Sequence, residues 1–489
     1  MLAGVHAIAA DFLNADVKAD RMAWYLILGI LVALFLWIAI RRRPQFAIGV
    51  VVPIAFLFPV WVMLPVFDAA EGTVVGSGID LKVGIGAAAL LLYCCFPKAT
   101  YPISLVPCDI AMIGLVVVHI TSDLVNQGPS WEIPARVLAE WWIPYVAGRV
   151  AFQFRRDISD YWKVLAAISI GLALLAIIEA FTHSSLLEML FGARPTEGVE
   201  RIHTRWGIRR AYGTCLNPIY MGVLQLLLLG WTVEVFLRVI RNRAHVAWVI
   251  APVLSLVGIV CTGSRGPLIG AAIAGFGMLF SLRPKARVPI LVLAVISLIL
   301  LVANRKLVLE TLESWAGENR RTSVVVINEN KEAFTSASSR FLLVQLYSIA
   351  MKRSGLLGFG TEAVTGFPVR VPLGPQEVET MKRIRFVDNT YVLMTLRFGY
   401  IGLFFFAAAL VAAALQLFYV CSQMPTESPG MLAGCLAGSL MGAIPVLFTV
   451  WMPPDYGFPL MWTCGVASGL LLALNSGNLQ ERKASKSNG

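Results

Sequence analysis

Three short polar segments stand directly before long apolar runs, and each has the composition of a helix N-terminus. They are Asn217-Pro218, Ser264-Arg265-Gly266-Pro267 and Asp388-Asn389-Thr390. Asn, Ser and Asp are preferred N-caps, and proline is favoured in the first helical turn. The free N–H groups and the positive dipole end of such a helix attract anions. If all three starts lie on the same side of a membrane, they predict a binding site for a phosphate-like group.

Arginines accompany two of these helix starts. Arg209 and Arg210 precede the first, and Arg265 lies within the second, in a loop of a few residues between two apolar runs. Guanidinium groups bind phosphates with parallel hydrogen bonds, and a charge this close to hydrocarbon is costly and usually functional. The simpler alternative is that Arg209 and Arg210 reach lipid headgroups and that the polar residues are ordinary caps. For the combined pattern we favour a phosphate or pyrophosphate site.

The chain that carries these segments is too apolar for a soluble protein. Of its 489 residues, 58% are hydrophobic and 14% are charged, and its mean hydropathy is +0.75. Soluble domains have about 45–50% apolar and about 25% charged residues. About thirteen apolar runs between Trp24 and Leu474 are long enough to cross or nearly cross a bilayer. We predict an all-α, polytopic transmembrane helical bundle of about 12–14 spans with a long, partly helical outer loop.

Positive charges predict how this bundle is oriented. If the loop at Arg41–Arg43 is cytoplasmic, the short segments of that side hold seventeen Lys and Arg residues, and those of the other side hold five. Cytoplasmic loops carry such an excess, so the N-terminus and the three helix starts are predicted to lie outside. The formal net charge of +11 then reflects orientation, and no nucleic-acid partner is expected. The first apolar run lacks a small-residue cleavage site, which predicts an anchor and not a signal peptide.

The predicted organisation has four parts. They are N-terminal transmembrane helices (1–182), a core with the arginine motifs and an outer loop at 304–390 (183–403), C-terminal transmembrane helices (404–474), and a cytoplasmic tail (475–489) that we expect to be disordered.

Parts of the outer loop are predicted to be ordered. Leu307–Trp315 and Phe341–Met351 have apolar residues at helical spacing, which predicts amphipathic helices at the membrane surface or over a cavity. In the second segment these residues are Leu342, Leu346 and Ile349. The glycine-rich stretch GLLGFG that follows predicts a tight turn.

No metal or cofactor is predicted. The eight cysteines form no CxxC pair and fall mostly within apolar runs, so we interpret them as buried apolar side chains. The sequence contains no zinc spacing, phosphate-binding glycine loop or dinucleotide fingerprint.

Several ionisable residues fall in or near the predicted spans. Asp109, His119, Glu140 and Glu179 could form the proton path of a transporter, but we favour structural or glycan-contacting roles for them. Asp109 and His119 are too far apart along one helix for a direct pair. Glu140 and Arg136 have the spacing of an i, i+4 pair.

Aromatic residues gather in the same region. They are Trp131, Trp141, Trp142 and Tyr145. A membrane-interface belt is the simplest interpretation, and tryptophans near an outer cavity could also stack on sugars.

Four segments occur in the order and topology of one known group of membrane enzymes. They are RRAYGTCLNPIYMG (Arg209–Gly222), TGSRGPLIG (Thr262–Gly270), SSRFLLVQLYSIAMKRSGLLGFG (Ser338–Gly360) and DNTYVLMTLRFGYIGL (Asp388–Leu403). Over roughly Arg201–Leu403 the chain resembles the O-antigen ligase and O-antigen polymerase superfamily. The resemblance implies a metal-independent, inverting glycosyltransferase of the bacterial inner membrane. Such an enzyme takes a glycan from undecaprenyl pyrophosphate at the periplasmic face and passes it to a glycan or to lipid A core, among membrane lipids. Other polysaccharide-export proteins are further candidate partners.

The resemblance also implies roles for single residues. Arg210 and Arg265 would bind the donor pyrophosphate, and Arg340 would help to hold the donor or close the site. Ligases of the superfamily often have a histidine at the position of Asp388, so Asp388 is the candidate general base for the acceptor hydroxyl; its alternative role is N-cap of the following helix. The departure favours polymerisation over ligation to lipid A core. The predicted site comprises catalytic Asp388 and Arg265 and substrate-binding Arg209, Arg210, Asn217, Ser264 and Arg340.

Two other classes of protein fit part of the sequence. A secondary transporter or lipid-linked glycan flippase would more often show related halves and helix breaks near mid-bilayer. Here the Gly and Pro breaks gather at the outer face, and the outer loop is long for a carrier. A scaffold subunit would give no reason for Arg265.

Overall fold

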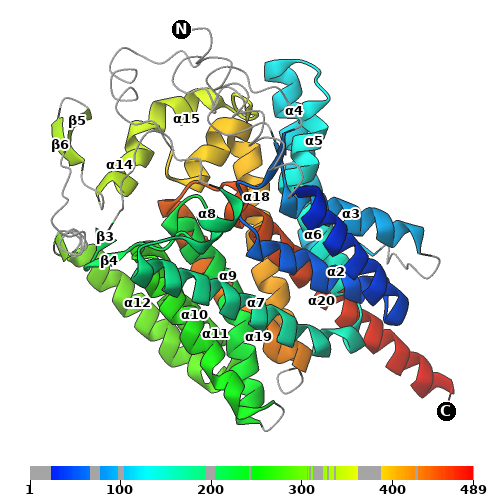
Figure 1. Cartoon of the computed structure of the whole chain (residues 1–489). Helices are drawn as coiled ribbons and strands as arrows, with labels where there is room; N and C mark the ends of the chain where they lie inside the picture. Colours follow the sequence, from blue (N-terminus) through cyan, green and yellow to red (C-terminus); the bar gives the residue numbers. More distant parts are fainter. Residues whose placement is uncertain are drawn as a thin grey trace.

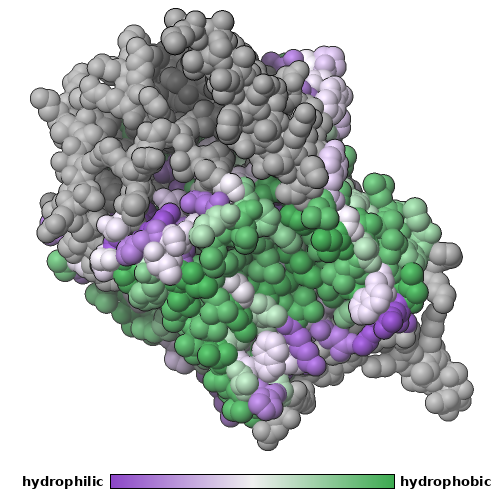
Figure 2. All heavy atoms as spheres, in the orientation of Figure 1, coloured by the Kyte–Doolittle hydropathy of each residue, from purple (hydrophilic) through white to green (hydrophobic). Residues whose placement is uncertain are grey.

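A computed structural model describes most of the chain. The described residues are 24–65, 78–96, 104–192, 204–241, 244–304, 307, 310–311, 323–327, 330–334, 338–361, 387–424 and 428–487. They form a bundle of α-helices with three short β-hairpins (Figure 1). Hydrophobic side chains cover the flank of the bundle between zones where hydrophilic residues gather (Figure 2), as expected of a protein that crosses a membrane. The predicted all-α polytopic bundle is confirmed.

The apolar runs predicted from the sequence lie mostly on helices, although the run that begins at Phe46 leaves the helix after Leu57 and includes β1 (Met63–Pro65). In chain order these helices are Trp24–Arg41, α2 (Pro44–Ile54) with a 3-10 turn at Ala55–Leu57, α3 (Leu81–Cys95), α4 (Pro107–Gln127), α5 (Glu132–Val137) continuing through a π-helical turn (Leu138–Trp142) into α6 (Ile143–Ala151), α7 (Arg155–Thr182), α9 (Pro218–Ile240), α10 (Ile250–Cys261) after a 3-10 turn (Val246–Val249), α11 (Arg265–Leu282), α12 (Arg287–Ala303) after a 3-10 turn (Pro284–Ala286), α18 (Thr390–Gln423), α19 (Ser428–Val446) with a 3-10 turn at Leu447–Thr449, and α20 (Pro454–Ser487). Eight of the described helices are long and apolar enough to cross a membrane. The shorter apolar helices are Pro44–Leu57, Leu81–Cys95 and Val246–Cys261.

Smaller elements occupy segments predicted to lie outside. They are the hairpins β1 (Met63–Pro65) with β2 (Gly78–Asp80), β3 (Thr204–Arg205) with β4 (Ile208–Arg209) and β5 (Ser323–Ile327) with β6 (Asn330–Phe334), and the helices α8 (Leu186–Phe191), α14 (Ser338–Leu346) and α15 (Ser348–Ser354). The β3–β4 turn consists of Trp206 and Gly207, both with positive φ (54° and 75°). Two-residue hairpin turns favour this geometry. None of these strands was predicted.

The predicted amphipathic helix at Phe341–Met351 is divided into α14 and α15 by a turn at Tyr347. Its buried side chains include Leu343, Tyr347 and Ala350. This face is one position along from the predicted one, whose Ile349 is 45% exposed. Leu346 of the predicted face is partly buried against the same core, so the prediction is confirmed in part. Tyr347, whose ring contributes a large apolar area when buried, takes the place of Ile349.

Helices α11 and α19 approach each other backbone to backbone. A Cβ atom on Gly442 would lie 2.2 Å from the carbonyl oxygen of Gly270, and one on Gly438 would lie 2.7 Å from that of Ala274. Small residues allow such close packing of membrane helices. The contact fixes α11 against the helix that leads into the α19–α20 connection.

A buried ion pair joins α4 to α6 and α20. Arg149 donates from Nε and Nη2 to the two oxygens of Asp109 at 2.8 and 3.1 Å, and the Tyr145 hydroxyl donates to Asp109 Oδ1 at 2.5 Å. Tyr145 Oη also lies 2.9 Å from Ser468 Oγ. Asp109 is thus paired with Arg149 and not with His119, which agrees with the expectation from their spacing.

We expect Asp109→Ala to lower the free energy of unfolding by about 3–5 kcal/mol, because Arg149 would remain as a buried charge without its partner. The matched control is Asp160→Ala, which removes an exposed ion pair to Arg42 (3.3 Å) and should cost less than about 1 kcal/mol. Thermal unfolding of both variants in one detergent measures the difference. Equal unfolding temperatures would contradict the prediction.

Some local expectations differ from the structure. Six cysteines are buried, but Cys94 and Cys95 are exposed near the end of α3. The described part of the tail after Leu474 continues α20 to Ser487, where disorder was expected. The predicted helix at Leu307–Trp315 lies mostly outside the described residues.

The aromatic belt is also revised. Trp141 and Tyr145 are buried inside the bundle, where Trp141 Nε1 donates to His119 Nδ1 at 2.8 Å. Trp131 is the exposed member, at 63%. Buried Trp and Tyr need a partner for their polar atoms, and the polar residues of α4 supply it.

Candidate functional site

The starts of α9 and α20 pack against each other. The Leu216 N–H donates to Asp455 Oδ1 at 2.7 Å. The rings of Tyr220 and Tyr456 lie 5.7 Å apart. Asp455 and Tyr456 belong to the first turn of α20, so the first predicted helix start meets a fourth one that the sequence had not singled out.

The starts of α18 and α11 contact the residues just before α20. The Thr390 hydroxyl donates to the Val450 carbonyl at 2.7 Å. A Cβ atom on Gly266 would lie 2.9 Å from the Thr449 hydroxyl oxygen. The three predicted helix starts therefore gather around the α19–α20 connection, although they are far apart in sequence.

The caps of these helices differ from one another. Asn217 Oδ1 accepts from Ile219 N at 2.9 Å, and Asn389 Oδ1 accepts from the N–H groups of Tyr391 and Val392 at 3.0 and 3.1 Å. The N-cap of α18 is therefore Asn389, and the alternative role of Asp388 as that cap is wrong. An asparagine side chain directly follows Asp388 and reaches both N–H groups, so the carboxylate is not needed there.

Arg210 and the start of α11 form one unit. Arg210 Nε donates to the Thr262 carbonyl at 3.0 Å, and its Nη2 donates to Ser264 Oγ at 2.9 Å. Ser264 is the residue before α11, but its hydroxyl makes no capping bond and instead donates to Thr262 O at 3.2 Å. The structure thus brings Arg210 and Ser264 together directly beside Arg265.

Arg205 supports the same loop and was not predicted. Its guanidinium donates to the Gly263 carbonyl. A Cβ atom on Gly263, whose φ is 57°, would lie 3.2 Å from Arg210 Cγ. Burial lowers the pKa of Arg205, although arginine remains protonated at physiological pH. The sequence signal was the hairpin turn Trp206-Gly207, which places Arg205 beside the following arginines.

Arg209 has structural partners. Its Nη2 lies 3.8 Å from Glu179 Oε1, and its Nη1 donates to the His183 carbonyl. Glu179 is buried and accepts from Tyr212 N and Gly213 N at 2.9 and 2.7 Å. These contacts tie the β3–β4 hairpin to the end of α7. The substrate-binding role of Arg209 stays a prediction.

Arg265 lies at the start of α11, and Asp388 directly precedes the cap of α18. Both helix starts contact the α19–α20 connection. Arg265 is the first residue of α11 and is half-buried, as is Asp388. Asp388 interacts electrostatically with Tyr456 at the start of α20. Burial, and then the charge of Asp388, raise the pKa of Tyr347 at the start of α15. Helix α15 of the predicted outer loop therefore lies in the same region as the start of α18. Arg340 lies on α14, and its role stays a prediction.

A second polar cluster lies between α4, the α5–α6 helix and α18. Asp123 Oδ2 lies 3.1 Å from His119 Nε2 and 3.5 Å from Arg136 Nη1. Arg136 also lies 4.0 Å from Glu132. Among the described residues Arg136 forms its ion pairs with Asp123 and Glu132, so the predicted pair with Glu140 is wrong. The carboxylate of Asp123 lies across the helix–helix contact, where spacing along one helix gives no information.

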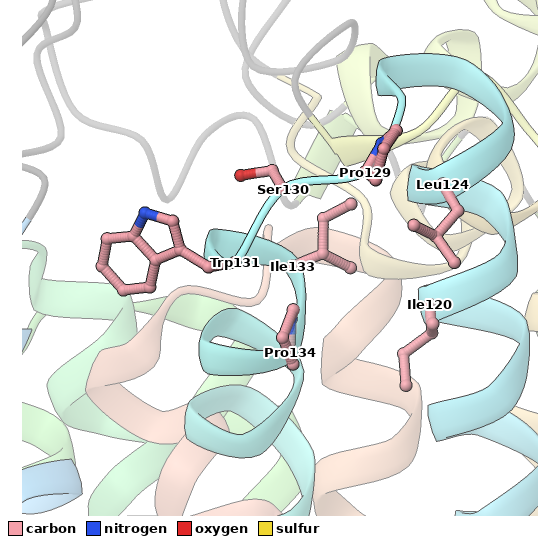
Figure 3. A pocket seen from close by; sticks show the side chains of 7 residues that line it. All are labelled: Ile120, Leu124, Pro129, Ser130, Trp131, Ile133 and Pro134. Atoms are coloured by element: carbon pink, nitrogen blue, oxygen red, sulfur yellow. The ribbon is translucent and has the colours of Figure 1, made fainter.

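A pocket of about 440 Å³ opens between α4 and α5 (Figure 3). Its lining is Ile120, Leu124, Pro129, Ser130, Trp131, Ile133 and Pro134. These side chains are almost all apolar, so the pocket lacks the donors that a pyrophosphate requires. In the part of the chain that the structure describes, no group of three or more His, Cys, Asp or Glu residues is arranged to hold a metal.

Fold and site together define a multi-pass membrane protein that gathers polar helix starts and arginines in one region. Residues 250–407 match the family described as O-antigen ligase. The match covers about a third of the chain, including Arg265 and Asp388 but not Arg210. It confirms the resemblance to the O-antigen ligase and polymerase superfamily, whose members are membrane glycosyltransferases. No curated protein matches the chain at a significant level.

Proposed function

We propose that this protein transfers a glycan from undecaprenyl pyrophosphate to an acceptor hydroxyl at the periplasmic face of the bacterial inner membrane. Chain polymerisation and ligation to lipid A core are the two forms of this reaction. The observation that carries the proposal is the binding of Arg210 to the Thr262–Ser264 loop directly before Arg265. Two guanidinium groups and the N-terminus of α11 together suit a pyrophosphate.

The donor side of the reaction needs charge stabilisation. As the bond between the anomeric carbon and the pyrophosphate oxygen breaks, the electron pair stays on that oxygen. Arg265 and the free N–H groups of α11 would stabilise the charge that develops there. Arg210 would contribute its own charge and also hold the 262–264 loop in place.

The acceptor side needs a place for one proton. Asp388 would take the proton of the acceptor hydroxyl as its oxygen attacks the anomeric carbon from the face opposite the leaving group, which inverts the configuration. Asn389 provides the cap of α18, so base catalysis by Asp388 does not compete with capping. Asn217 and Ser264 would hold the α9 and α11 starts that frame the site.

Transfer is expected to proceed without a divalent cation, because arginines and helix N-termini supply the positive charge. Purified enzyme in EDTA should keep its rate within about twofold of that in MgCl₂, whereas loss of a metal that stabilises the leaving group costs far more. Radiolabelled lipid-linked glycan and an acceptor glycan report the rate. A strict requirement for Mg²⁺ or Mn²⁺ would count against the proposal.

Deletion of the gene tests the function in cells. Accumulated single repeat units on the lipid carrier would identify a polymerase, and accumulated long, unattached polymer would identify a ligase. The control is complementation by the wild-type gene. Unchanged glycans with altered solute uptake would refute the proposal and favour a carrier.

A further inference from the structure

Helix α18 is interrupted at Gly399, whose φ and ψ are 67° and −169°. In an unbroken helix, Tyr400 N would donate to Leu396 O, and Ile401 N would donate to Arg397 O. The interruption lies within a candidate membrane span, where unsatisfied backbone groups are costly. These four groups must therefore find other partners.

One segment of the outer loop supplies all four partners. We call residues 355–361 the inserted segment. Its hydrogen bonds to α18 are Phe359 N to Leu396 O (2.8 Å), Gly360 N to Arg397 O (2.9 Å), Tyr400 N to Gly355 O (3.1 Å) and Ile401 N to Leu356 O (3.3 Å). The predicted tight turn is thus also the element that completes a broken helix.

Glycine is required on both sides of this contact. A Cβ atom on Gly399 would lie 2.2 Å from the Leu356 carbonyl oxygen, and one on Gly358 would lie 2.3 Å from that of Arg397. Gly358 also has a positive φ of 76°, a region that other residues rarely adopt. The insertion is therefore encoded by glycines in two segments about forty residues apart.

Helix α4 holds the inserted segment from the other side. Asp123 Oδ1 accepts from Thr361 N at 2.7 Å, and Thr361 Oγ1 lies 3.2 Å from His119 Nε2. Asn126 Nδ2 donates to Gly358 O at 3.2 Å. Asp123 and Thr361 are both buried, so water does not compete strongly for these contacts.

The inserted segment is linked through α15 to the region of the predicted site. It begins directly after α15, which packs on α18. Tyr347, at the beginning of α15, is buried and interacts electrostatically with Asp388. The inserted segment therefore fixes where α15 lies on α18, the helix that begins two residues after Asp388.

We propose that Asp123 is a positioning residue, which holds the inserted segment in the break of α18 through Thr361 and so keeps α15 packed on α18, the helix that begins two residues after Asp388, during glycan transfer. The positioning role rests on the proposed function, whereas the anchoring itself does not. Asp123 acts through the inserted segment and touches neither the donor nor the acceptor in this arrangement.

Two substitutions at one position separate anchoring from folding. Thr361→Pro removes the N–H group that donates to Asp123 and leaves α4 unchanged. Thr361→Ala keeps that N–H and loses the hydroxyl. We expect Thr361→Pro to lower kcat about tenfold with the donor KM within about twofold of wild type, because a misplaced neighbour affects chemistry more than binding. Thr361→Ala should keep wild-type kcat.

Hydrogen exchange then tests whether the inserted segment has lost its position. The N–H groups of Phe359 and Gly360 donate to Leu396 O and Arg397 O, so they should exchange slowly in wild-type protein and in Thr361→Ala. In Thr361→Pro they should exchange at least about tenfold faster, while amides in the middle of α9 keep their wild-type rates.

Several outcomes would overturn the inference. They are wild-type kcat in a folded Thr361→Pro protein, unchanged exchange of the Phe359 and Gly360 amides in that protein, and rapid exchange of these amides in wild-type protein. The exchange rates do not depend on activity, so the wild-type protein tests the anchoring even if Thr361→Pro does not fold. Absence of glycan transfer by wild-type protein whose amides are protected would refute the proposed function and leave the anchoring in place.

Discussion

Arg265→Lys should lower glycan transfer about a hundredfold, which is the scale for loss of one preorganised donor to a developing oxyanion. Lysine keeps the positive charge but loses the planar fork that binds two oxygens in parallel. Arg265 is the first residue of α11, so its side chain begins at the same helix end as the N-terminal N–H groups. The loss should appear mainly in kcat, since the leaving group gains charge in the transition state.

The same helix offers a matched control. Arg283 directly follows α11 at its other end and is exposed, so Arg283→Lys makes the same chemical change away from the helix starts. It should leave transfer within about twofold of wild type, as is usual for an exposed site. Thermal unfolding should be equal for the two variants. Retention of full activity by Arg265→Lys would contradict bidentate pyrophosphate binding.

Asp388→Asn should lower kcat by a factor of about a hundred to ten thousand, the usual contribution of a general base. Asparagine has the same shape but cannot accept the proton of the acceptor hydroxyl. Since Asn389 and not Asp388 caps α18, the unfolding temperature should not change. Steady-state transfer assays with saturating donor measure the effect.

The neighbouring cap provides the control for this substitution. Asn389→Ala removes the side chain that accepts from Tyr391 N and Val392 N and should cost about 1 kcal/mol of stability. Its transfer rate should fall much less than that of Asp388→Asn. If Asp388→Asn keeps most of its activity while lowering the unfolding temperature, the residue has a structural role and the acceptor is activated in another way.

The structure also changes how the arginines are interpreted. Arg209 and Arg210 are adjacent in sequence, and both were predicted to bind substrate. In the fold, Arg209 turns to Glu179 at 3.8 Å, while Arg210 turns to the Ser264 hydroxyl at 2.9 Å. Successive residues of a strand end point to opposite sides, so two neighbours of one type acquire different partners.

Local patterns were sufficient for the helices and for the positions of their N-termini. An apolar run of membrane length can satisfy its backbone only as a helix, and residues such as Asn217 mark where it begins because caps act within one turn. For that reason the sequence alone predicted the all-α bundle, and it placed Arg265 at a helix start. The family match over residues 250–407 includes three of the four motifs and leaves out Arg209–Gly222.

Only the tertiary structure decided which distant groups meet. The insertion of 355–361 into α18 pairs backbone groups, and every residue carries the same N–H and C=O, so no side-chain pattern could reveal it. Likewise, Asp123 shows no local sign that it accepts from Thr361 at 2.7 Å. Sequence determines where helices such as α9 and α18 start, because capping acts within a turn, whereas the break of α18 at Gly399 was found only in the structure. Which starts gather, and what fills a break, follow from contacts between segments far apart in the chain.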